Sequence, residues 1–134
     1  MDRPVRLIFA VSCFLCIAAG CRNKNVSEQQ DPIVLGYSQL GDESSWRTQN
    51  TFSIKSAAKR SGIKILFEDA MQNPANQIKA LRSFIAYKVD VIAFSPLVET
   101  GWDTVLGEAK AAGIPVILVD RMIETSDDSL YTAA

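Results

Sequence analysis

Four mostly apolar runs, each followed by polar turn residues or a helical pattern, constrain the fold of this chain more than any other feature. The runs are Ile33–Ser38, Ile63–Phe67, Asp90–Ser95 and Ile114–Val119. Strands that are apolar almost throughout, with helices between them, are typical of a parallel sheet covered on both faces. Right-handed crossovers then wind such units into a Rossmann-like or flavodoxin-like layer. The predicted fold class is therefore α/β.

Helical spacing of apolar residues predicts three helices between the strands. The first spans Ser45–Arg60 and is closed by Gly62, although its apolar face is thin. The second begins at Asn73–Pro74, which is a capping residue followed by a first-turn proline. The third spans Thr100–Ala112 and places Trp102 on an apolar stripe, so we expect Trp102 in the core. A fifth strand is expected to begin within Leu130–Thr132.

Residues 1–21 have the order of a secretory signal, with arginines first, then an apolar run, then small residues. The apolar run, Leu7–Ile17, is shorter than the roughly 20 residues that span a bilayer. Ala18–Cys21 resembles the bacterial lipobox, in which Cys21 is lipid-modified, and an ordinary signal peptide with an incidental cysteine is the alternative. The polar segment 22–31 is expected to be a flexible tether, followed by one small domain over residues 32–134.

Composition and motifs argue against several classes of function. The chain has no histidine and a formal net charge of −1, which does not favour zinc chemistry or nucleic-acid binding. Cys13 and Cys16 form a C-x-x-C inside the targeting segment, where a redox or metal role is not expected. A G-x-G-x-x-G, a P-loop and a nucleophile elbow are all missing from the sequence. We therefore expect neither an enzyme nor a cofactor or metal site.

Charged and aromatic residues follow the predicted strands. In a parallel sheet these positions meet at one edge, which is where open α/β folds bind ligands. Trp46 offers a flat apolar face beside the hydrogen-bond donors of Arg47, although packing of Trp46 onto the sheet is an equally good interpretation. Asp120 and Arg121 together match a vicinal diol, because one accepts and the other donates hydrogen bonds. The predicted edge carries Asp42, Glu43, Trp46, Arg47, Glu68, Asp69, Asp120 and Arg121.

Five stretches carry a family resemblance: GYSQLGDESSWR (36–47), NQIKALRSF (76–84), DVIAFSP (90–96), TGW (100–102) and EAKAAGIPVILVDR (108–121). The chain from residue 33 to about 132 resembles the amino-terminal lobe of periplasmic sugar-binding proteins of the ribose/galactose type, particularly galactofuranose-binding members. The resemblance implies an incomplete first lobe of a type I periplasmic-binding-protein fold, whose two lobes close on a sugar. It also implies these ligand contacts: Glu43, Ser44, Ser45, Trp46, Arg47, Asp120 and Arg121.

The expected function is extracytoplasmic sugar binding for an ABC importer, with permease subunits as partners and a lipid anchor at Cys21. A second lobe is not encoded in these residues, so a truncated form with weak sugar binding is expected. Two alternatives stay open: a sugar-sensing domain that presents its ligand to a membrane receptor or kinase, and a non-functional gene fragment. The sequence does not fix which sugar is bound.

Overall fold

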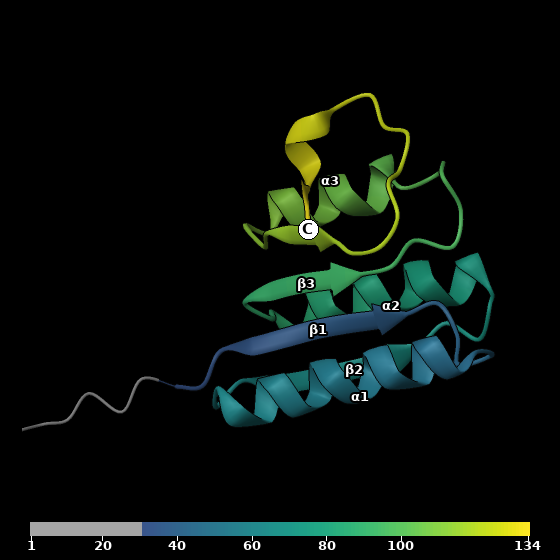
Figure 1. Ribbon diagram of the computed structural model, residues 1–134. Coiled ribbons are helices and arrows are strands. Elements are labelled where there is room, and N and C mark those ends of the chain that lie inside the picture. Colours follow the sequence, from purple (N-terminus) through teal and green to yellow (C-terminus); the bar gives the residue numbers. More distant parts are fainter. Residues whose placement is uncertain (1–30) are drawn as a thin grey trace, which may run out of the picture.

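The computed structural model describes residues 31–134, so the predicted signal peptide with Cys21 and almost all of the predicted tether lie outside the described residues. Five parallel strands form one sheet in the order β2-β1-β3-β4-β5 (Figure 1). This sheet confirms the predicted α/β class. Within the described part of the chain, no helix is long and apolar enough to cross a membrane. In chain order the elements are β1 (Val34–Gln39), α1 (Ser45–Arg60), β2 (Lys64–Asp69), α2 (Pro74–Tyr87), β3 (Val91–Phe94), α3 (Asp103–Ala111), β4 (Val116–Leu118), η1 (Asp128–Leu130) and β5 (Thr132–Ala133).

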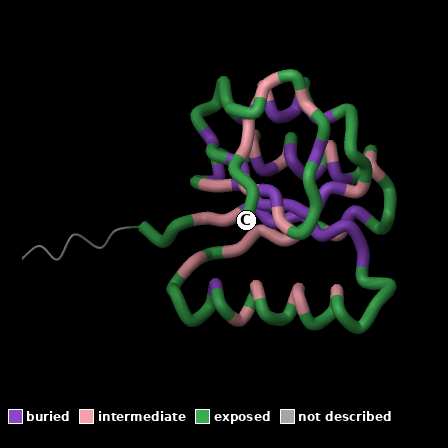
Figure 2. Tube along the Cα trace, turned by 45° about the horizontal axis from the view of Figure 1, so that its top comes forward, coloured by how far each residue is buried: buried purple, intermediate pink, exposed green. Residues whose placement is uncertain are grey.

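The helices cover the two faces of the sheet unequally. Helices α2 and α3 pack on one face, whereas α1 lies on the other (Figures 1 and 2). The apolar core lies between the strands and the α2–α3 pair, and its largest fully buried side chains include Trp102, Phe84 and Phe94. The ring centroids of Phe94 and Trp102 are 4.9 Å apart, so the predicted core position of Trp102 is confirmed.

Local sequence explains where α2 begins and ends. The Asn73 side chain accepts a hydrogen bond from the Ala75 N–H at 2.9 Å, and Pro74 follows in the first turn, where a missing N–H costs nothing. The helix ends at Lys88, whose φ of 55° is left-handed. This cap turns the chain directly into β3.

Several predicted boundaries differ from the structure by one residue or more, and two of these differences have a clear cause. Helix α3 begins at Asp103 rather than Thr100, because the preceding loop is held by the Trp102 indole N–H, which donates to the Val98 carbonyl at 2.8 Å. Strand β4 is shorter than predicted, since the Ile114 N–H still donates to Ala109 at the end of α3. The fifth strand starts at Thr132, inside its predicted range, because η1 occupies 128–130.

Candidate functional site

The loops that follow β1, β3 and β4 meet at the carboxyl edge of the sheet, and two buried amides fix them there. The Gln39 amide nitrogen donates to Asn50 at 3.1 Å and to Thr51 at 3.2 Å, which ties the end of β1 to α1. The fully buried Gln77 donates to the Ser95 carbonyl at 2.7 Å and accepts from the Leu97 N–H at 3.0 Å. Both amides therefore hold the edge in shape.

The loop after β1 is shaped by a helix cap and an ion pair. Ser44 is the N-cap of α1, and its hydroxyl accepts from the Arg47 N–H at 3.3 Å. Glu43 and Arg47 lie 3.8 Å apart, charge to charge, one helical turn from each other. The Glu43 carboxylate folds back over Gly41, which has no Cβ to obstruct it. Ser45 is the exposed first residue of the helix.

Trp46 and Arg47 present an apolar surface beside a cation. Trp46 is 54% exposed, so the prediction that it packs onto the sheet is wrong. It lies in the first turn of α1, outside the core. The Arg47 guanidinium carbon lies 5.8 Å from the Trp46 ring centroid, within the range of a cation–π contact. Arg47 Nη1 is buried and has no hydrogen-bond partner among the described residues. An acceptor placed here would satisfy that donor.

Asp120 lies two residues after the end of β4 and has a strained backbone. Its φ is 72°, and the Arg121 N–H donates to the Val119 carbonyl at 2.8 Å, which closes a three-residue γ-turn around Asp120. Such conformations are uncommon for residues other than glycine and cluster at functional sites. Within residues 31–134, the side chains of Asp120 and Arg121 form no hydrogen bond or ion pair with the protein. Both remain available to a ligand.

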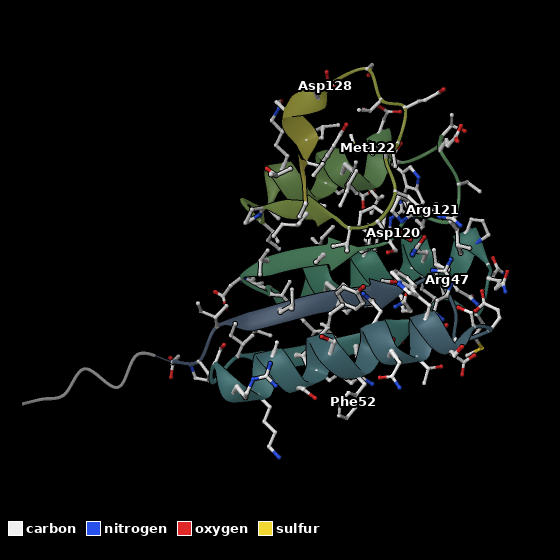
Figure 3. All side chains as sticks on the ribbon, in the orientation of Figure 1. Arg47, Phe52, Asp120, Arg121, Met122 and Asp128 are labelled. Carbon is white, nitrogen blue, oxygen red and sulfur yellow. The ribbon has the colours of Figure 1, made fainter. Side chains whose placement is uncertain are left out.

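Tyr37 connects the two loops electrostatically. Burial raises the pKa of its hydroxyl above the usual value, and the nearby Ser95 hydroxyl lowers it. The negative charge of Asp120 raises the same pKa, whereas the positive charge of Arg47 lowers it. Two charges that act on one hydroxyl lie close to it, so residues 73 positions apart share one edge. Figure 3 shows Arg47, Asp120 and Arg121 at this end of the sheet.

The edge does not gather every residue predicted for it. Glu68 and Asp69 end β2, which is separated from β4 by two strands, and Asp69 accepts from the Met71 N–H at 2.7 Å. Its carboxylate thus stabilises a turn. Asp42 is exposed. Arg121 also lines a cavity of about 500 Å³ with Met122, between the loops after β3 and β4.

Polar residues inside the strands themselves also lie at this edge and were not predicted. Tyr37 and Ser38 are at most 1% exposed, and the Ser38 hydroxyl has no partner in the described part of the chain. The Ser95 hydroxyl donates to the Val119 carbonyl at 2.9 Å and joins the ends of β3 and β4. The available signal was a polar residue that ends an apolar run, as in Tyr37-Ser38-Gln39 and Phe94-Ser95.

Comparison with known proteins identifies the family. The model of the periplasmic binding protein domain matches residues 35–134. The chain belongs to the periplasmic binding protein family. The parallel sheet is that of the type I fold in this family, of which these residues form a part. The resemblance read from the sequence is thereby confirmed.

Several similar proteins have a sugar in their name or in their solved complex. The chain is 51% identical over 100 residues to the galactofuranose-binding protein YtfQ of Escherichia coli K12, covering 75% of this chain and 31% of that protein. A Mycobacterium smegmatis structure in complex with β-D-fucofuranose is 57% identical, with a TM-score of 0.72, and the match covers 74% of this chain and 33% of that one.

The arabinose ABC transporter binding component of Shewanella sp. ANA-3, solved with α- and β-L-arabinofuranose, is 53% identical, with a TM-score of 0.72. This match covers 75% of our chain and 34% of the Shewanella chain. The chain therefore spans about a third of the length of these relatives. All three are named or solved as binding proteins or sugar complexes, and none is named as an enzyme, in line with the sequence prediction.

Proposed function

We propose that this chain provides one side of a furanose-binding site in an extracytoplasmic solute-binding protein of a sugar ABC importer. The observation that carries the proposal is the shared edge of Arg47 and Asp120, whose polar atoms are not fully used by the fold. The similar proteins that are named for galactofuranose, or solved with fucofuranose or arabinofuranose, support a furanose as the ligand class. The chain is not proposed to catalyse a reaction.

Each proposed contact has a chemical role. The exposed Trp46 ring stacks against the C–H face of the sugar, while Arg47 donates to a ring or hydroxyl oxygen. Asp120 accepts from two neighbouring hydroxyls and Arg121 donates beside it. Glu43 orients Arg47 through their 3.8 Å ion pair, and the start of α1 at Ser44–Ser45 offers backbone N–H groups that have no partner inside the helix.

Binding by this chain alone is expected to be weak. A single edge covers one side of a sugar, whereas tight pockets bury most of their ligand's surface. We expect dissociation constants on the order of millimolar, equivalent to about 4 kcal/mol of binding free energy. Micromolar affinity for the isolated chain would contradict the idea that this edge supplies only one side of the site.

Tryptophan fluorescence tests the ligand class, because the chain has two tryptophans and only Trp46 is exposed. Methyl β-D-galactofuranoside should give a saturable change in emission, and the pyranoside isomer should give a much smaller one. Trp46→Ala should abolish the response, whereas Phe52→Ala, which removes an exposed ring on the outer side of α1, should preserve it (Figure 3). Absence of any response from the native chain would refute sugar binding at this edge, and equal responses would refute furanose selection.

The membrane anchor is a separate proposal that concerns residues outside the described part of the chain. We infer that Cys21 is lipidated and holds the domain at the outer side of a membrane, because small residues precede it after an apolar run. Cys21→Ser should move the protein from the membrane fraction to the soluble one in bacterial cells. A variant that stays with the membrane would rule out the anchor.

A further inference from the structure

Charge is divided unequally between the two edges of the sheet. At the carboxyl edge, the charged residues predicted to gather there are five carboxylates and two arginines. The opposite, amino edge lies where the strands begin and the helices end, and it carries four cations and two exposed apolar or aromatic side chains (Figure 1). We call these six residues the amino-edge patch: Ile33, Lys59, Arg60, Lys64, Tyr87 and Lys88.

Backbone hydrogen bonds bring the patch together around the start of β1. The Lys64 N–H donates to the Ile33 carbonyl at 2.8 Å, and the Asp90 N–H donates to the Val34 carbonyl at 2.9 Å. Lys88 lies two residues before Asp90, and the last turn of α1 lies just before β2. Cations from α1, from β2 and from the end of α2 therefore surround the point at which the chain enters the sheet.

The four cations of the patch are exposed, and within residues 31–134 they form no ion pair. Lys110, farther along the same edge, differs because it is paired with Asp127 at 3.1 Å. Two carboxylates lie near the patch, those of Asp31 and Asp90, and the Asp90 carboxylate also accepts from the Val34 N–H at 2.7 Å. Four cations against two carboxylates leave a net excess of two positive charges.

Helix ends explain only part of this pattern. Lys59 and Arg60 lie in the last turn of α1, where the helix dipole favours positive charge. The dipole does not account for Lys64, which is in β2, or for Ile33 and Tyr87, which are 54% and 75% exposed. Tyrosine is enriched at membrane–water interfaces, and lysine and arginine are attracted to anionic headgroups. The composition of the patch therefore fits a membrane surface.

We propose that the amino-edge patch docks on the anionic phospholipid headgroups of a membrane. The order of the chain supports this partner, because the apolar run of residues 7–17 and Cys21 precede the point at which the chain enters the sheet. The ten residues 22–31 span no more than about 35 Å even when fully extended, so an anchor at Cys21 would keep the patch close to the bilayer. A lipid chain together with a basic patch gives stable membrane attachment.

Docking by this patch orients the domain. The carboxyl edge, with its excess of carboxylates, is repelled by an anionic surface and turns toward solution. Figure 3 shows Arg47, Asp120 and Arg121 at that edge, at the opposite end of the sheet from the start of β1. The docked domain thus leaves these side chains open to solutes. This proposal goes beyond sugar binding and does not depend on it.

Quenching of tryptophan fluorescence by brominated lipid tests which part of the domain contacts the membrane. Cys13→Ser and Cys16→Ser leave Cys21 as the only cysteine, and the full chain is coupled through it to a maleimide lipid in vesicles. The attachment then does not depend on natural lipidation. Tyr87→Trp places a reporter in the patch. The matched control is Phe52→Trp, because Phe52 is also an exposed aromatic residue but lies eight residues, or about 12 Å along α1, from the end of that helix (Figure 3).

Brominated phosphatidylcholine mixed with phosphatidylglycerol should quench the tryptophan at position 87 far more than the one at position 52. Brominated phosphatidylcholine alone, or high salt, should remove this difference. Lys64→Glu should lower the docking equilibrium constant, taken from the quenched fraction, by at least about fivefold, the loss expected for one cation at an anionic membrane. Lys79→Glu changes an exposed lysine in the middle of α2 and should have a smaller effect.

Equal quenching at positions 87 and 52 in anionic vesicles would overturn the proposal, and so would equal effects of Lys64→Glu and Lys79→Glu. Loss of quenching when inorganic phosphate is added at constant ionic strength would overturn it in favour of a site for small anions. Circular dichroism checks that each variant is folded, and Ile33→Trp replaces Tyr87→Trp if the latter does not fold. Because no sugar is present, failure here leaves the sugar proposal standing, and the reverse also holds.

Discussion

The backbone at Asp120 allows conformational strain to be separated from ligand contact. Replacing Asp120 by Ala or by Gly removes the same carboxylate, and the exposed side chain has no hydrogen bond in the described part of the chain to lose. The two variants differ in how they tolerate the φ of 72°. A residue with a Cβ resists this conformation, whereas glycine accepts it. We therefore expect Asp120→Gly to be more stable than Asp120→Ala, the reverse of their order at an ordinary position.

The magnitude follows from two opposing terms. A left-handed conformation costs a residue with a Cβ about 1–2 kcal/mol. Glycine loses about 0.4–1 kcal/mol relative to alanine, because its unfolded chain is freer. The difference leaves Asp120→Gly more stable by about 1 kcal/mol. For a domain of this size, that is a difference in Tm of about 4–8 °C.

Thermal unfolding followed by circular dichroism measures this difference on the full chain. Asp128 in η1 provides the control, because it is an exposed aspartate whose φ is not positive (Figure 3). At Asp128 the alanine variant should be the more stable of the pair. If Ala and Gly at position 120 unfold at the same temperature, or in the order seen at 128, the strain argument is wrong. In the fluorescence titration both variants at 120 should lose the sugar response equally.

Two further predictions concern packing and pH. Gly36→Ala should destabilise the domain by about 1–3 kcal/mol, because the added Cβ would lie 2.5 Å from the Phe84 ring. The control is Gly107→Ala, which has open space around it in α3 and should be neutral or stabilising. Chemical denaturation compares the two variants, and equal effects would contradict the packing argument. The hydroxyl and N–H of Ser129 lower the pKa of Asp127 from 3.8 to about 2. The Asp127 carboxylate therefore stabilises the fold fully above pH 4, and this stabilisation is lost as the pH falls toward 2. Asp127→Asn should make the free energy of unfolding less dependent on pH between pH 2 and 4. An unchanged pH dependence would show that Asp127 does not contribute to it.

Much of the fold was predictable because its signals are local. Apolar runs identified all four longer strands. Both ends of the helix Ser45–Arg60 were predicted correctly, since the cap at Ser44 and the turn at Gly62 lie close to those ends in the sequence. The start of α3 was misplaced because a side-chain hydrogen bond, which helical periodicity does not reveal, shapes the loop before it. Trp102 fits a helical stripe, but its indole reaches back to Val98 and keeps the preceding loop out of the helix.

Predictability of the candidate site was mixed. Charged residues after apolar strands, such as Asp120 and Arg121, are conspicuous because burial in a sheet gives them no benefit. Tyr37 and Ser95 were missed, because their hydroxyls matter through partners on other strands. The γ-turn at Asp120 was also missed, since aspartate is common at many backbone conformations and only the hydrogen bond across it reveals the turn.

The sequence by itself determined the class of the fold, the family and the edge at which the proposed ligand residues gather, because strand and helix periodicity and the positions after each strand depend only on order along the chain. Tertiary structure alone decided that Trp46 is exposed, that Asp69 supports a turn and that Arg47 and Asp120 act on one buried hydroxyl. Within residues 31–134 it also leaves the α1 side of the sheet only partly covered, which follows from strand order and crossover handedness. These properties depend on which strands become neighbours, and neighbours are fixed only when the whole sheet has formed.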